Sequence, residues 1–171
     1  MRPSIFLAVS LSSNYKKKVV EKIVDELKSN VSIKLEYNID RIVYQSFNDI
    51  SNFLKANLNS TSENIIIFVD IPNISLEEIY QIKSMAKIFQ VFADIPEHYH
   101  SFFKYTQFLY KGIFIEEPEY KNFFDIYGLA SYDGSLFCHE TAKIIGETSS
   151  YESLIPFRKR LYDFSFVGRL D

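Results

Sequence analysis

Carboxylates and imidazoles are concentrated in one short segment, Asp94-Ile95-Pro96-Glu97-His98-Tyr99-His100. A general base accepts a proton from a substrate hydroxyl, and both a carboxylate and a neutral imidazole can do so. Asp94, Glu97 and His98 are therefore our candidates for a catalytic base. The same residues have a structural explanation, because Asp94 can cap a helix that starts at Pro96 and Glu97 would stabilise the positive end of that helix.

Polar residues also follow two short apolar segments, at residues 5–9 and 65–69. Ser12 comes after the first segment, and Asp70 and Asn73 come after the second. If both segments are parallel strands, their carboxyl ends meet at the edge of the sheet where α/β proteins bind ligands. We therefore expect Ser12, Asp70 and Asn73 to contact a bound ligand, which is an acceptor substrate if the family resemblance given below holds. A phospho-acceptor role for Asp70 is disfavoured, because the first strand lacks the paired acids that would hold Mg²⁺.

Two charged clusters have both a functional and a structural explanation. Glu117, in the turn Glu116-Glu117-Pro118-Glu119, is a further ligand-binding candidate, for an acceptor if the family resemblance given below holds, although such acids can also be simply solvated. Lys16, Lys17 and Lys18 lie near the start of an expected helix, where positive charge is unfavourable. They could attract a phosphate-bearing acceptor or make weak peripheral contact with an anionic membrane, and the alternative is a solvated helix face.

The glycines and the single cysteine point away from cofactor, metal and thiol chemistry. The five glycines form neither a G-x-G-x-x-G turn nor a Walker A loop. His98 and His100 would point to different faces of a helix, and Cys138 is distant in sequence, which disfavours a zinc site. Cys138 and His139 would point about 100° apart on a helix, too far for a thiol and its base. We expect no cofactor and no metal.

Composition sets the class of protein. The chain has 171 residues, of which 47% are hydrophobic, so it can form a packed globular core. Its net charge of −3 disfavours a dedicated nucleic-acid binder. The longest apolar runs have five residues, far short of the ~20 that cross a bilayer. Together with the single cysteine, which a reducing compartment allows, these features predict a cytoplasmic protein.

Apolar periodicity predicts alternating strands and helices. Continuous apolar runs indicate buried strands, and apolar residues at helical spacing indicate amphipathic helices. This pattern predicts an α/β fold in three layers, a mainly parallel, Rossmann-like sheet flanked by helices. We expect strands at 5–9, one or two within 31–46, and at 65–69, 89–93 and 113–115; and helices at 14–29, from Ser46 or Asn48 through Leu58, from a Ser75 capping box to 87, from 96 to a stop at Gly112, and at 135–145.

The last eighteen residues carry a family resemblance. Leu154-Ile155-Pro156-Phe157 followed by Tyr162-Asp163-Phe164-Ser165-Phe166-Val167-Gly168-Arg169 resembles the hinge and first strand-turn of the second domain in GT-B glycosyltransferases. The similarity is to bacterial surface-polysaccharide enzymes of exostosin-like or spore-maturation type. It implies a Rossmann-like acceptor-side domain at residues 1–153, with residues 154–171 as the connector and first strand of a second domain that continues beyond Asp171.

The resemblance implies an activity and a donor site. The chain would be the acceptor-side domain of a nucleotide-sugar-dependent glycosyltransferase in polysaccharide or glycoconjugate synthesis. Its acceptor would be a saccharide or a lipid-linked saccharide, and the nucleotide sugar would bind only with the second domain, so this chain alone would be catalytically incomplete. Gly168 and Arg169 would lie at the donor diphosphate, or else form an ordinary turn. The alternative is a free-standing Rossmann- or flavodoxin-like binding module without catalysis.

Overall fold

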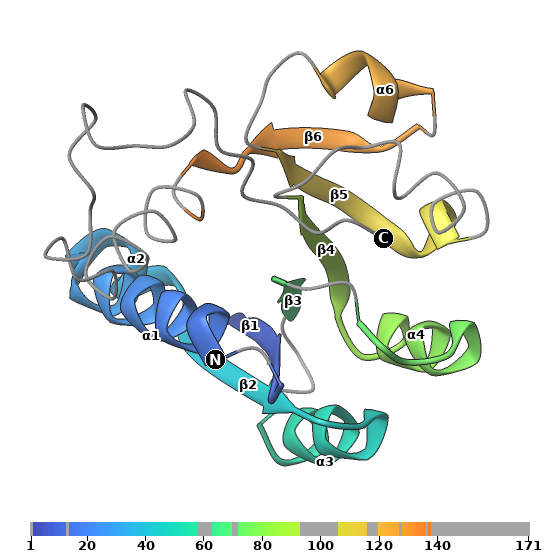
Figure 1. The fold of residues 1–171 in the computed structure, drawn as a ribbon. Helices are drawn as coiled ribbons and strands as arrows, with labels where there is room; N and C mark the ends of the chain where they lie inside the picture. Colours follow the sequence, from blue (N-terminus) through green and yellow to red (C-terminus); the bar gives the residue numbers. More distant parts are fainter. Residues whose placement is uncertain are drawn as a thin grey trace, which may run out of the picture.

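Six parallel strands form one sheet at the centre of the protein (Figure 1). The computed structural model describes residues 2–12, 14–57, 63–69, 72–92, 106–115, 120–126, 128–135 and 137. All five strand pairings within these residues are parallel, which confirms the predicted α/β class. The strand order is β2-β1-β3-β4-β5-β6, where the strands are β1 (Ser4–Ser10), β2 (Asn38–Tyr44), β3 (Ile65–Phe68), β4 (Lys87–Phe92), β5 (Tyr110–Ile115) and β6 (Ala130–Asp133).

Helices cover both faces of the sheet and complete the three layers. The described helices are α1 (Asn14–Ser29), α2 (Val31–Glu36), α3 (Phe47–Asn57), α4 (Leu76–Lys83), the short 3-10 helix η2 (Gln107–Leu109) and α6 (Lys121–Asp125). Apolar side chains of α1 pack with Leu7, Val9 and Ile67 on one face of the sheet. Apolar side chains of α3, α4 and α6 pack with Phe6 and Ile66 on the opposite face. Two separate cores therefore stabilise the sheet, as expected when parallel strands are buried on both sides.

The first strand-helix unit follows directly from its sequence. Helix α1 spans Asn14–Ser29, the predicted range, and its apolar positions recur at helical spacing. Val19, Val20, Ile23 and Val24 are all buried against the sheet. The interior strands β3 and β4 lie where the apolar runs at residues 65–69 and 89–93 predicted strands, and they pair in parallel with Ile67 opposite Phe89.

Of the one or two strands expected within residues 31–46, the structure has one, β2, and residues 31–36 form helix α2 instead of a second strand. Helix α2 begins after Asn30, whose side-chain oxygen accepts a hydrogen bond from the Ile33 N–H at 3.3 Å. This cap stabilises the first turn, because it pairs an N–H group that the helix itself leaves without a partner. Val31 and Leu35 are 70% and 63% exposed, so the apolar alternation does not correspond to a buried strand face.

Gly112 lies inside strand β5 and does not terminate a helix. The predicted helix from residue 96 mostly falls outside the described residues, but β5 already begins at Tyr110. A Cβ atom at Gly112 would lie 2.6 Å from the Tyr132 ring and 2.7 Å from the Ala130 carbonyl oxygen. The glycine is therefore explained by the close approach of β6 and not by a helix end.

Helix α4 shows the predicted capping box but ends earlier than expected. The Ser75 hydroxyl accepts from the Glu78 N–H at 3.2 Å, and the Glu78 carboxylate accepts from the Ser75 N–H at 2.7 Å. The helix stops at Lys83, and Lys87 already starts strand β4. Of the helix predicted at residues 135–145, only residues 135 and 137 are described, both in helical conformation.

Candidate functional site

The strand order creates a switch point between β1 and β3. From β1 the chain crosses to β2 on one side, and it later returns to β3 on the other side of β1 (Figure 1). Helix α1, which follows β1, and helix α4, which follows β3, pack on opposite faces of the sheet, and doubly wound α/β proteins usually bind ligands at such a switch point. Backbone hydrogen bonds hold this edge together, because Leu11 N–H donates to the Tyr44 carbonyl at 2.7 Å and Val69 N–H to the Ala8 carbonyl at 2.9 Å.

Ser12 lies on the first of these two loops. Its hydroxyl is 2.8 Å from that of Ser10, the last residue of β1, and its N–H donates to the Ser10 Oγ at 3.4 Å. Helix α1 begins two residues later, at Asn14, and has no acidic residue in its first turn. The exposed Ser12 side chain can therefore hydrogen-bond a polar ligand close to the positive end of α1.

Asn73 lies on the loop that follows β3. Its side chain is exposed, and the preceding Pro72 is buried. The capping box at Ser75 begins two residues later and defines where this loop ends. An exposed amide offers both a donor and an acceptor to a hydroxyl-rich ligand. Ser12 and Asn73 thus stand on the two loops that follow adjacent strands, as the sequence predicted.

The other sequence-predicted site residues lie outside the described part of the chain. The structure therefore gives no placement for the candidate bases or for the donor-site residues. The same is true of the Cys138-His139 pair and of the connector at residues 154–171. The site residues concerned are Asp70, Asp94, Glu97, His98, Glu117, Gly168 and Arg169.

Gln90 is a buried polar residue that the sequence reasoning missed. It lies in β4, is 1% exposed, and its side-chain amide donates to the carbonyls of Phe68 at 3.1 Å and Val91 at 3.0 Å. Its side-chain oxygen is buried and accepts no hydrogen bond from the residues that the structure describes. Phe68 is the last residue of β3, so Gln90 holds the point at which the Asn73 loop leaves the sheet. In the sequence, Gln90 could have been noticed as an amide among the apolar residues of β4.

Tyr110 is buried on the α3 and α4 side of the sheet, where its hydroxyl stays neutral. Burial raises the pKa of the Tyr110 hydroxyl far above its ordinary value, and the proximity of Tyr44 acts in the same direction. Both effects disfavour the phenolate, because a buried negative charge loses its hydration and two such charges would repel each other. Tyr110 therefore cannot act as an anionic nucleophile or base at neutral pH.

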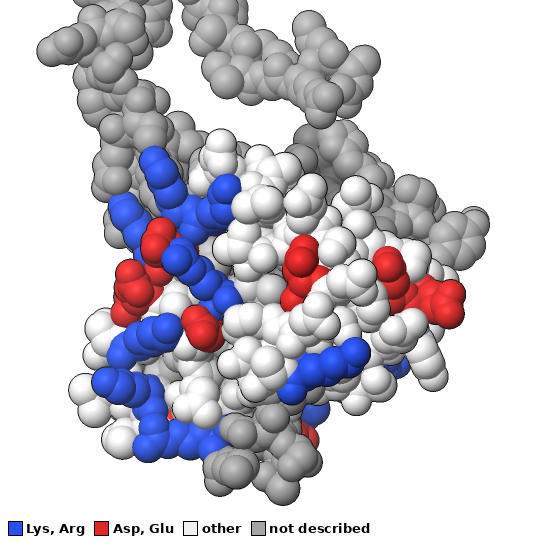
Figure 2. All heavy atoms as spheres, turned by 90° about the horizontal axis from the view of Figure 1, so that it is seen from below, with Lys and Arg blue, Asp and Glu red and all other residues white. Residues whose placement is uncertain are grey.

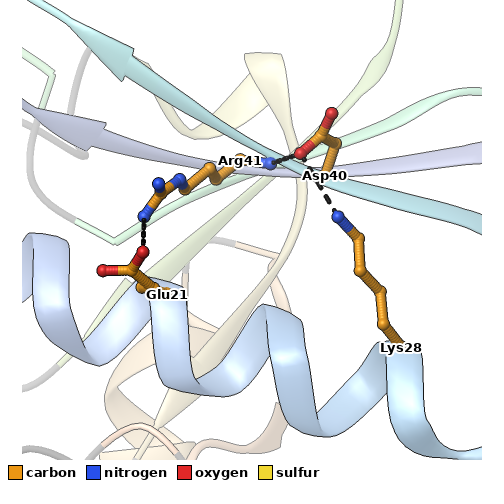
Figure 3. Close-up of polar contacts among 4 residues, drawn as sticks. All are labelled: Glu21, Lys28, Asp40 and Arg41. Atoms are coloured by element: carbon orange, nitrogen blue, oxygen red, sulfur yellow. Dashed lines mark hydrogen bonds and ion pairs between the residues drawn. The ribbon is translucent and has the colours of Figure 1, made fainter.

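Charged side chains gather on the side of the molecule that α1 and β2 form. On the left of Figure 2, lysines and arginines lie together with acidic residues among them. Figure 3 shows two of these contacts, an ion pair between Arg41 and Glu21 at 2.9 Å and one between Lys28 and Asp40 at 3.5 Å. This pairing reduces the net positive field that the basic residues of α1 would otherwise produce.

Metal and membrane signatures are missing from the described residues. No group of three or more His, Cys, Asp or Glu side chains in the described ranges is placed to hold a metal ion. Among the helices that the structure describes, none is both long enough and apolar enough to span a bilayer.

The fold defines the class of protein as a three-layer, Rossmann-like α/β domain. Polar residues follow the carboxyl ends of β1 and β3, at its switch point. In comparisons with known proteins, no family model, curated protein or solved structure matches this chain.

Proposed function

We propose that this chain is the acceptor-side domain of a nucleotide-sugar-dependent glycosyltransferase of the GT-B type. The observation that carries the proposal is the switch point between β1 and β3, with exposed Ser12 and Asn73 on the two loops beside it. A hydroxyl and an amide at such an edge suit a saccharide, whose hydroxyl groups both donate and accept hydrogen bonds. The resemblance of residues 154–169 to the interdomain hinge of these enzymes supports the same assignment.

In this proposal the residues of the edge bind and activate the acceptor. Ser12, Asp70, Asn73 and Glu117 hydrogen-bond a saccharide or lipid-linked saccharide. One of Asp94, Glu97 and His98 takes the proton from the attacking hydroxyl. The acceptor oxygen then bonds to the anomeric carbon of the donor sugar while the bond from that carbon to the diphosphate breaks. The nucleoside diphosphate leaves with the electron pair.

The donor belongs to a second domain in this proposal. Gly168 and Arg169 lie at its first turn, where a glycine lets the backbone approach a diphosphate and an arginine offsets the negative charge. The residues of the acceptor-side domain provide neither a Gly-rich loop nor a Walker A loop for the nucleotide. The proposal includes a cytoplasmic location, with which a single cysteine is compatible.

The acceptor half of the proposal is tested on this chain by NMR titration with neutral hexoses, N-acetylhexosamines and short oligosaccharides. We expect shifts at Ser12 and Asn73, and weaker binding in the Ser12→Ala and Asn73→Ala variants. Asn52→Ala is the matched control, because Asn52 is an exposed amide of α3 away from this edge. Saccharide binding that leaves Ser12 and Asn73 unperturbed would contradict the assignment of the acceptor site.

The transfer half needs a protein that also carries the donor domain. There we expect one of the variants Asp94→Asn, Glu97→Gln and His98→Gln to lower kcat by at least about a hundredfold, which is the usual contribution of a general base. Saccharide binding without any transfer from sugar nucleotides would favour the alternative, a non-catalytic binding module.

A further inference from the structure

A cavity lies at the amino ends of the strands, on the opposite side of the sheet from the loops of Ser12 and Asn73. It has a volume of about 300 Å³ and is lined by residues at the amino ends of β4 and β5 and at the end of α4. In Figure 1 the end of α4 leads directly into the start of β4. The N–H of Lys87 donates to the Asn64 carbonyl at 2.8 Å, which joins the segment before β3 to the same wall. The cavity is at the lower end of the size range of small-molecule sites.

Positive charge dominates the walls of this cavity. Three lysines line it, Lys83 from α4, Lys87 from β4 and Lys111 from β5, against the single carboxylate of Glu63. The charges of these four residues sum to two net positive charges. Lys87 pairs with Glu63 at 2.5 Å between Nζ and Oε2. That ion pair neutralises one lysine and leaves Lys83 and Lys111 to define the field in the cavity.

Two of the three lysines, Lys87 and Lys111, act on the Glu63 carboxyl. The pKa of the Glu63 carboxyl is lowered first by its hydrogen bond and charge interaction with Lys87 and further by the charge of Lys111. Lys111 makes no hydrogen bond or ion pair through its ammonium group within the described residues. Its charge therefore acts on the cavity without a bonded counter-ion.

Lys83 contacts Phe108, an aromatic residue that also lines the cavity. Its ammonium donates to the Phe108 carbonyl at 2.8 Å and lies 5.7 Å from the centre of the Phe108 ring. An ammonium group has three N–H donors, so two remain for a ligand. Phe108 is 58% exposed, so its ring is accessible to a ligand. The cavity thus offers two ammonium groups next to an accessible aromatic face.

We propose that this cavity binds a small aromatic anion, a phosphate or carboxylate carried on a planar ring. The anionic group contacts Lys83 and Lys111, and the ring packs on Phe108. Charge-assisted hydrogen bonds from lysine suit either anion, while ring packing on Phe108 distinguishes an aromatic ligand from an inorganic ion. This site is distinct from the candidate site at Ser12 and Asn73. It lies at the amino ends of the strands, whereas Ser12 and Asn73 follow the carboxyl ends.

The test is a titration of this chain with phenyl phosphate, compared with inorganic phosphate and with phenol. We expect phenyl phosphate to shift the NMR signals of Lys83, Lys87 and residues 108–111, and to bind more tightly than either fragment. We also expect its affinity to fall as ionic strength is raised, because salt screens exposed charges. Equal affinity for inorganic and phenyl phosphate would overturn the aromatic part of the proposal.

Two variants locate the site and one controls for charge. Lys111→Ala should weaken phenyl phosphate binding about fivefold, as expected for one partly exposed charge contact. Phe108→Ala should weaken phenyl phosphate but not inorganic phosphate. Lys55→Ala, which removes an exposed lysine of α3 that does not line the cavity, should change neither.

The outcomes that overturn the proposal are equally specific. They are the absence of phenyl phosphate binding at millimolar concentration, unchanged affinity in Lys111→Ala, and equal losses in Lys111→Ala and Lys55→Ala. Since Lys111 is exposed, its replacement leaves the core intact, and an unchanged thermal unfolding midpoint verifies this. The Lys111 variant thus remains decisive even if Phe108→Ala fails to fold.

Discussion

The guanidinium of Arg41 lies 2.9 Å from the carboxylate of Glu21, so the edge strand β2 is joined across the surface to helix α1 (Figure 3). Both side chains are about half exposed, at 41% and 53%. The neighbouring Asp40 carboxylate accepts a hydrogen bond from the Arg41 N–H at 2.9 Å and lies 3.5 Å from Lys28. Charged residues therefore occupy the middle of β2, where an edge strand benefits from protection against pairing with other chains.

A double-mutant cycle on this ion pair should give a small coupling energy. We expect Glu21→Gln and Arg41→Gln to couple by less than about 1 kcal/mol, because exposed ion pairs gain little over hydration. The measurement is urea unfolding of the wild type, both single variants and the double variant. The coupling should decrease further in about 0.5 M salt. A coupling above about 2 kcal/mol would show that the pair is far less hydrated than its exposure indicates.

Replacement of Ile67 by Asp should abolish cooperative unfolding. Ile67 lies in the interior strand β3 and packs with apolar side chains of α1, with 9% of its surface exposed. An unpaired carboxylate there loses its hydration without gaining a partner. Ile67→Val is the control, and it should cost only about 0.5–1.5 kcal/mol. Thermal melting followed by circular dichroism distinguishes the two, and an unchanged transition in Ile67→Asp would invalidate the core assignment.

The carboxyl of Asp49 should contribute to the pH dependence of stability. The Gln45 and Ser46 N–H groups donate to it at 2.9 Å each, and these bonds lower its pKa below the ordinary value. A lowered folded-state pKa gives stability that is complete above the unfolded-state pKa and is lost as the pH falls through the folded-state pKa. We therefore expect Asp49→Asn to flatten the loss of stability as the pH falls below about 4, the ordinary pKa of an aspartate.

The matched control for this acid response is Asp25→Asn. Asp25 is an exposed residue of α1 and accepts no backbone hydrogen bond within the described residues. Urea unfolding midpoints at neutral and acid pH should fall equally in Asp25→Asn and the wild type. A smaller fall in Asp49→Asn than in both is the expected result, and identical falls in all three proteins would refute the role of Asp49.

Gly112→Ala should destabilise the protein by about 1–3 kcal/mol, the usual cost of overpacking. The new Cβ would meet the Tyr132 ring and the Ala130 carbonyl, both of which belong to β6. Adding Tyr132→Ala should recover little of the loss, because the Ala130 carbonyl is backbone and cannot move away from β5 without breaking the pairing. Chemical denaturation of the single and double variants measures this, and full recovery in the double variant would assign the contact to the ring alone.

The parts of the fold that the sequence predicted are those where local pattern and burial agree. Strand β3 is a continuous apolar run, and α1 has its apolar residues at helical spacing, so both were placed correctly. Residues 31–36 were misread because alternating apolar residues fit a strand, whereas the Asn30 cap favours a helix. Gly112 was misread because its reason, the nearby β6, is a tertiary contact that no local pattern contains.

The positions of the candidate site residues could be predicted only from the expected order and direction of the strands. The expectation that Ser12 and Asn73 lie on loops at one edge depended on β1 and β3 being parallel neighbours, which the structure confirms. The cluster of Lys83, Lys87 and Lys111 had no sequence signal, because these residues come together only through the pairing of β4 with β5. Sequence pattern gives the elements, but the order of the strands in the sheet determines which side chains meet.

The position of β1 between β2 and β3 has a consequence for how fast the sheet can assemble. Ile5 pairs with Ile39 of β2 on one side and with Ile65 of β3 on the other, and both pairings are parallel. Neither pairing can therefore form as a simple hairpin. During synthesis β1 and β2 are available long before β3, and one side of β1 lacks its partner for that interval. Folding with such high contact order is slow, and the waiting strand edge is open to association with other chains. Production of this protein should therefore benefit from added chaperone, which shields an unpaired strand edge until its partner is available.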